Sequence, residues 1–103
     1  MSKKILKDMI QVQEGSVVSR EIVKRGDAGT VSLFAFDQGQ GLSEHTAPFE
    51  AFVYIVEGRA RVRIGTESQE LNAGEALILP AHKPHAVEAV EKFKMLLVLV
   101  KNE

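Results

Sequence analysis

Short apolar and β-branched runs, separated by turn residues, follow one another along almost the whole chain. Glycine, asparagine, aspartate and proline punctuate these runs roughly every ten residues, and no helical periodicity fills the intervals. Because no helix intervenes, the pattern favours an antiparallel sandwich or small barrel over a parallel sheet. We expect strands near residues 16–24, 30–36, 43–47, 51–57, 59–64, 68–71, 76–80, 85–90 and 93–100.

Several of the expected turns have a clear chemical basis. The segment RGDAG, residues 25–29, supplies two glycines and an aspartate for a hairpin between the first two strands. Gly58, Gly65 and Gly74 stand at three later turns, where glycine adopts a positive φ at little cost. The best helical candidate is a turn or two around residues 5–10.

The charge balance and the absence of cysteine exclude several classes of function. The 13 basic and 14 acidic residues leave a net charge of −1, so no global field favours nucleic acid or an anionic membrane. Without cysteine the chain has no disulfide, no thiolate metal site and no cysteine nucleophile. The N-terminus lacks the apolar core of a signal peptide, and the longest apolar run, residues 95–100, is too short to span a bilayer. We therefore expect a cytoplasmic protein with no nucleic-acid or membrane partner.

One expected strand, RARVRI, alternates cleanly between charged and apolar residues. Arg59, Arg61 and Arg63 share one face, which would suit an acidic partner. No second basic cluster or aromatic stack joins them, however, and Glu67 and Glu70 follow on the next strand. We therefore interpret the arginines as a solvated sheet face with glutamates as neighbours.

Two other expected strands are apolar on both faces, residues 51–56 (AFVYIV) and 95–100 (MLLVLV). In a barrel one face of each strand points inward, so the outer faces of these strands need a cover. An N-terminal strand of the same chain or a second subunit could supply it. We favour a homodimer, because isologous pairing is the commonest way to bury such a surface. Tyr54 is expected to point outward from its strand, where it would contribute to packing or to that interface.

Two blocks of the sequence resemble those of the single-domain cupins, the smallest members of a superfamily of antiparallel jelly-roll barrels. In the first block Gly39 is followed after five residues by His45, and the next strand ends at Gly58. The second block, residues 74–85, runs from a glycine through five residues to a proline, and His85 follows after AHKP. Both blocks together, in this order and at this distance, are a strong signal of the fold.

The resemblance covers about residues 30–100 and implies an all-β, antiparallel jelly-roll (cupin) barrel. On this basis residues 1–103 form a single cupin domain. Residues 30–100 would be its barrel core, and residues 1–29 would be N-terminal strands that could form the dimer.

In cupins the two blocks normally supply three histidines and one glutamate, which bind a divalent transition metal inside the barrel. Carried over by position, His45 matches the first histidine and His85 the last. Alanine stands at the other two ligand positions, Ala47 and Ala51, and His82 occupies a turn-glycine position. The resemblance therefore implies a degenerate site, with the first and last histidines as candidate ligands of iron, manganese, nickel, copper or zinc.

Strand parity tests whether another residue could complete such a site, because side chains alternate between the two faces of a strand. Glu44 and Glu88 lie an odd number of residues from the candidate histidines and are expected to face outward. Glu50 also faces away unless the chain bulges just before it, and His82 would have to turn inward from a proline-rich segment. Without a third ligand a metal would be held loosely, since catalytic sites usually need about three.

Three functions fit these observations. The first is a small-molecule site in the barrel, anchored by His45 and His85 and assisted by a metal if one binds; the resemblance then implies oxygenase, isomerase or decarboxylase chemistry. The second is a metal-free module that binds or senses a small molecule, with both histidines as neutral, hydrogen-bonded groups. The third is a purely structural, dimerising barrel. The sequence does not decide whether the protein is an enzyme.

Overall fold

The computed structural model of the protein describes residues 2–101 and confirms an all-β antiparallel fold. It contains one short 3-10 helix and seven strands: η1 (Leu6–Asp8), β1 (Val17–Lys24), β2 (Gly29–Phe36), β3 (Gly41–His45), β4 (Glu50–Ile64), β5 (Glu67–Asn72), β6 (Ala76–Leu79) and β7 (His85–Val100). The helical turn and the hairpin at residues 25–29 are present as expected. Within residues 2–101, no helix is long and apolar enough to cross a membrane.

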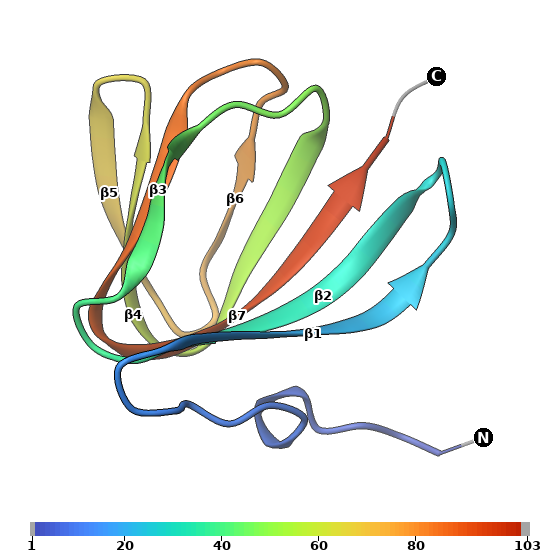
Figure 1. Ribbon diagram of the computed structural model, residues 1–103, viewed down its shortest axis with the longest axis vertical. Coiled ribbons are helices and arrows are strands. Elements are labelled where there is room, and N and C mark those ends of the chain that lie inside the picture. Colours follow the sequence, from blue (N-terminus) through green and yellow to red (C-terminus); the bar gives the residue numbers. More distant parts are fainter. Residues whose placement is uncertain (1, 102–103) are drawn as a thin grey trace.

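Two long, bent strands, β4 and β7, run through both layers of the barrel (Figure 1). The first half of β4 pairs with β6 and with the second half of β7, which also pairs with β2, and β1 extends this layer at its edge. The second half of β4 pairs with β5 and with the first half of β7, which also pairs with β3. The two layers enclose a common interior, as in a jelly roll.

Gly58 marks the corner at which β4 passes from one layer to the other. We expected separate strands on either side of this glycine, and that division is wrong, because the ladder with β7 continues through two register shifts. The φ angle of Gly58 is 84°, and an added Cβ would collide with the carbonyl oxygen of Lys92. Only glycine fits this corner. For the same reason β7 is one bent strand and not the two expected at residues 85–90 and 93–100.

One end of the barrel interior is densely packed. Phe36 and Phe93 are buried and stack with their ring centroids 4.3 Å apart and their planes at 7°. Ile55 and Ala60 from β4 are also buried and belong to the same core cluster. We name this region, defined by these four residues, the packed end.

The N-terminal segment covers part of the outer face of the sheet. Ile10 is buried there with Leu33 and Ala35 of β2, and the segment runs along the outer side of β1 and β2 (Figure 1). Lys94, only 7% exposed, donates a hydrogen bond from Nζ to the carbonyl oxygen of Lys7 at 2.6 Å. Apolar contact and this hydrogen bond therefore hold the segment against the sheet.

The rest of that outer face carries a continuous apolar row. The ladders align one residue from each of five neighbouring strands in direct register: Val23, Val31, Val98, Phe52 and Ile78. Phe52 is 40% exposed and Ile78 is 57% exposed. We refer to these five residues as the outer row. The N-terminal segment thus covers only part of the apolar outer surface that the sequence predicts.

Candidate functional site

The end of the interior opposite the packed end is hollow. A cavity of about 400 Å³ lies among β2, β3, β4, β6 and β7, together with the loop between β3 and β4. Its polar lining residues are Ser43, His45 and His85, and the others are Phe34, Leu42, Ala47, Phe49, Ala51, Val53, Leu79, Val87, Met95, Leu97 and Leu99. We name this region the hollow end. Its size and its apolar wall suit a small organic molecule.

His45 and His85 meet at this cavity, as the sequence predicts. They are register partners across the ladder between β3 and β7. His45 stands exposed at the rim, whereas His85 is only 5% exposed. Their Nε2 atoms lie 3.0 Å apart, and the ring planes cross at 74°. The two rings therefore form one polar pair at the mouth of the cavity, with His45 on the solvent side and His85 on the buried side.

Each histidine is oriented by the backbone two residues before it. The Nδ1–H of His45 donates to the carbonyl oxygen of Ser43 at 2.8 Å, and the Nδ1–H of His85 donates to the carbonyl oxygen of Lys83 at 3.0 Å. A carbonyl oxygen can only accept, so we assign the proton of each neutral ring to Nδ1. Both Nε2 atoms then carry a lone pair and no hydrogen, and they face each other across 3.0 Å.

With these tautomers neither Nε2 atom carries a hydrogen, so the contact between them is not a hydrogen bond while both rings are neutral. Two neutral imidazoles carry two ring protons, and both are used by the backbone carbonyls of Ser43 and Lys83. A hydrogen bond between the rings requires a third proton, which would give the pair a positive charge. Alternatively, a molecule in the cavity supplies the hydrogen that both lone pairs lack.

The environment of His85 opposes the extra proton. Burial lowers the pKa of His85 below its ordinary value, the hydrogen bond to the carbonyl of Lys83 raises it, and the proximity of His45 lowers it further. Burial is the largest of the three effects. The neutral form of His85 is therefore favoured near pH 7.

The two residues considered as conditional ligands lie outside the cavity. Glu50 is exposed and pairs with Val100 in the ladder to β7, as strand parity predicts. His82 is exposed in the turn before β7. Its φ angle of 66° is positive, which is unusual for a residue with a side chain and accords with the turn-glycine position that it occupies. Neither the inward bulge nor the inward turn is present.

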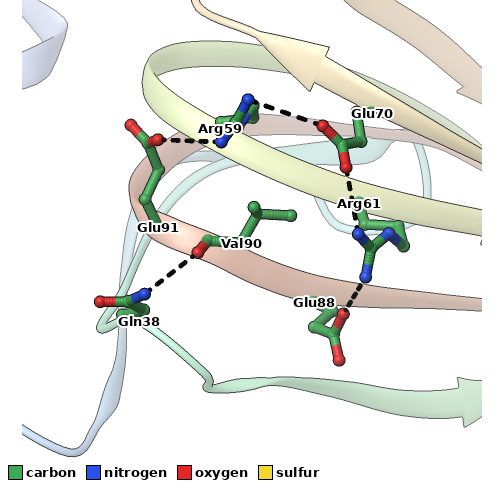
Figure 2. Close-up of polar contacts among 7 residues, drawn as sticks. All are labelled: Gln38, Arg59, Arg61, Glu70, Glu88, Val90 and Glu91. Atoms are coloured by element: carbon green, nitrogen blue, oxygen red, sulfur yellow. Dashed lines mark hydrogen bonds and ion pairs between the residues drawn. The ribbon is translucent and has the colours of Figure 1, made fainter.

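Glutamates on the outside of the barrel form ion pairs with the arginines of β4. Arg61 lies 3.0 Å from Glu70 and 2.7 Å from Glu88, and Arg59 bridges Glu70 and Glu91, as Figure 2 shows. Each of these side chains is more than a third exposed, so the pairs add little stability individually.

A depression of about 390 Å³ outside the barrel includes Arg61 and Arg63 in its lining. Glu88 neutralises the first, and Glu44 lies 2.7 Å from the second. This depression thus offers no unpaired positive charge to an acidic partner, which agrees with the interpretation of a solvated, glutamate-paired face.

Several residues of the cavity wall were not singled out from the sequence. Phe34 could have been identified, because it lies two residues from the buried Phe36 and shares its strand face. Phe49 lies in the loop between β3 and β4, where parity gives no guidance. Leu42 lines the cavity together with His45 only because the β3 register shifts between them.

The donor set does not fit the metal site that the cupin resemblance implies. Ala47 and Ala51 line the cavity at the two replaced ligand positions, and their methyl groups cannot coordinate a metal. Within residues 2–101, no three histidine, cysteine, aspartate or glutamate side chains gather in a way that could hold a metal ion. Two imidazole nitrogens remain, fewer than the three protein ligands typical of a catalytic metal.

Comparison with known proteins places the chain in a family. The family described as "Cupin domain" matches residues 32–101. A polyketide synthase, CurC, from Streptomyces cyaneus is 37% identical over 59 residues, which is 56% of this chain and 38% of that protein. The chain therefore spans less than half the length of this relative.

Solved structures agree with the family match. A conserved protein of unknown function from Streptococcus pyogenes is 33% identical, with a TM-score of 0.90 over 100% of this chain and 89% of the other. A cupin superfamily protein from Desulfitobacterium hafniense is 28% identical, with a TM-score of 0.92 over 98% of this chain and 92% of the other. A cupin 2 conserved barrel domain protein from Leptotrichia buccalis is 35% identical, with a TM-score of 0.88 over 92% of this chain and 46% of the other. The chain belongs to the cupin family and forms a small cupin barrel.

Proposed function

We propose that this cupin binds a small, largely apolar molecule at the hollow end and anchors one polar group of it on His45 and His85. The observation that carries the proposal is the cavity of about 400 Å³ with an apolar wall and a single histidine pair at its mouth. Pockets of this kind bind by apolar contact and use a few polar groups to orient the ligand. The name of the Streptomyces cyaneus relative makes polyketide-derived molecules a first group to test.

We propose that this binding does not require a resident metal. The support is the chemistry of the donor set, since methyl groups at Ala47 and Ala51 stand where two ligands would be needed. Metal-assisted binding remains the second candidate, because two nitrogens 3.0 Å apart could both lie about 2.0–2.1 Å from one ion. A purely structural barrel is the third candidate.

The first experiment identifies what co-purifies with the protein. Untagged protein is examined by native mass spectrometry, together with an Ala51→Leu variant that fills the cavity and a Glu50→Gln variant as its outward-facing neighbour. We expect a bound small molecule in the wild type and in Glu50→Gln, and its loss from Ala51→Leu. A wild-type protein that carries no molecule, and is not stabilised by any compound of an apolar fragment set, would contradict the proposal and favour the structural barrel.

Elemental analysis of the same preparations separates the first two candidates. We expect less than one equivalent of iron, manganese, nickel, copper or zinc per chain. One full equivalent that disappears in both His45→Ala and His85→Ala would instead support the metal-assisted candidate.

We further propose that the outer row pairs with the same surface of a second copy to form a homodimer. The row is apolar across five strands, and an isologous interface would bury two such surfaces at once. Light scattering at micromolar concentration should give twice the monomer mass, and Phe52→Lys should reduce it to one chain. Glu67→Lys, on β5, is the control for the charge change. A wild-type monomer refutes the dimer.

The cytoplasm remains the proposed compartment. Detection of the native protein in a fraction other than the cytoplasmic one, after gentle cell fractionation, would refute this assignment.

A further inference from the structure

We infer that the molecule bound at the hollow end carries a neutral hydroxyl group, such as a phenol or an enol, and donates its hydrogen to the histidine pair. This inference rests on the proposed binding function and names the chemical class of ligand. It is argued from the hydrogen-bond geometry of the two imidazoles, which line the cavity and carry no hydrogen on either Nε2 atom while both rings are neutral.

The backbone fixes the direction of both rings. His45 and His85 each place Nδ1 on a carbonyl oxygen two residues earlier, at 2.8 and 3.0 Å. Moving the proton of either ring to Nε2 would set the Nδ1 lone pair against a carbonyl oxygen, and flipping the ring would replace this hydrogen bond by a C–H contact. The Nε2 atoms therefore present two lone pairs 3.0 Å apart, with no hydrogen between them while both rings are neutral.

The cavity wall offers little to satisfy these lone pairs. Ser43 is the only other residue of the lining with a polar side chain, and none of the lining residues is acidic or a lysine or arginine. An unsatisfied polar atom at an apolar site costs about 1–3 kcal/mol, so a ligand that brings a donor gains relative to one that does not.

The same wall discriminates among possible donors. A carboxylate would set its own lone pairs against those of the histidines and would lose its hydration in an apolar cavity. An ammonium group could donate, but its charge would be desolvated with no carboxylate in the lining to compensate. A neutral hydroxyl on an apolar body supplies the hydrogen without a buried charge, and a phenol, with a pKa of about 10, keeps that hydrogen at pH 7.5.

Three probes of matched size test the inference by calorimetry at pH 7.5: 4-propylphenol, 4-propylanisole and 4-propylbenzoate. We expect the phenol to bind about tenfold more tightly than the methyl ether, and the benzoate to bind most weakly. In the double variant His45→Leu/His85→Leu, which removes both acceptors, the preference for phenol over ether should fall to within about twofold. His82→Gln, outside the cavity, is the matched control and should keep the preference.

The outcomes separate the two proposals. Equal binding of phenol and ether, or tightest binding of the benzoate, overturns the hydroxyl inference while the pocket remains a binding site. Failure of all three probes and of the apolar fragment set overturns both. A preference that survives in the double variant also overturns the inference, because a group other than the histidine pair would then receive the hydrogen.

A second measurement requires no variant. Nitrogen NMR of the imidazoles at pH 7.5 should show the proton of both His45 and His85 on Nδ1, and the exposed His82 provides an internal reference. A proton on Nε2 of either ring, or one shared between the two Nε2 atoms, would overturn the inference.

Discussion

The packed end and the hollow end of the barrel are built from the same strands by the same alternation, yet one is solid and the other encloses a cavity. On β4, the inward residues Ala51, Val53 and Ala60 all belong to the core cluster, but only Ala51 and Val53 line the cavity. Two stacked phenylalanines fill the packed end, while two alanines and a histidine pair leave room at the hollow end. The comparison shows that strand alternation decides which side chains point into the barrel. The volume of those side chains and the paths of the strands decide whether they fill the interior or leave a cavity.

The largest expected effect contrasts a core residue of each end. Phe93→Ala should lower the free energy of unfolding by about 3–5 kcal/mol, because it removes half of the buried stack and leaves a void. Leu99→Ala should cost less than about 2 kcal/mol, because Leu99 is only partly buried and already borders the cavity. Urea denaturation measures both. Equal losses would show that the hollow end is collapsed in solution.

A pair of alanines on one strand face gives the next largest contrast. Ala60→Leu should destabilise the protein by about 1–3 kcal/mol, because Ala60 is fully buried and does not border the cavity, so three more carbon atoms would overpack the core. Ala51→Leu should change stability by less than about 1 kcal/mol, because the added atoms enter the cavity. Thermal and urea unfolding of the two variants test this directly. A larger loss for Ala51→Leu would contradict the assignment of the two ends.

The turn beside the hollow end carries a local strain that substitution can remove. Glycine at position 82 accepts the φ angle of 66° without the steric cost that His82 has. His82→Gly should therefore raise the free energy of unfolding by about 0.5 kcal/mol, after allowance for the greater freedom of glycine in the unfolded chain. Ala81→Gly, at a neighbouring residue whose φ is not positive, is the control and should lower stability. A loss in both variants would show that the turn is not strained.

The buried histidine at the hollow end should make the free energy of unfolding weakly dependent on pH. Because burial lowers the pKa of His85 in the folded protein, the unfolded chain binds more protons below the ordinary value of about 6.5. Stability contributed by neutral His85 is therefore complete above that value and declines as the pH falls toward 5.5. Denaturation at pH 7.5, 6.5 and 5.5 should show this decline in the wild type and a smaller one in His85→Gln. If the free energy of unfolding declined equally with pH in the wild type and in His85→Gln, burial would not lower the pKa of His85.

Much of the fold could be predicted from the sequence, because alternation and turn chemistry act over a few residues. The hairpin at residues 25–29 and the positive φ of Gly58 follow from local preferences. The continuity of β4 and β7 could not be predicted, since a register shift in a bent ladder resembles a turn when the partner strand is unknown. Parity correctly kept Glu50 outside the cavity, but it did not predict that Leu42 and His45 share one wall.

The candidate site shows the same limit. The two cupin blocks identified His45 and His85 as partners, and their replaced companions Ala47 and Ala51 indicated a degenerate site. The backbone carbonyls that fix both imidazole tautomers could not be predicted, because a hydrogen bond to the carbonyl two residues earlier depends on the exact ring rotation.

The sequence by itself determined an antiparallel barrel, its membership in the cupin family and the pair of histidines at its mouth, because these depend on periodicity and on short-range spacing. Only the tertiary structure decided that the interior is packed at one end and hollow at the other, and that the two imidazoles meet beside the cavity with both Nδ1 atoms on backbone carbonyls. These properties depend on distances between segments far apart in the chain, which side-chain packing fixes only once the strands have paired.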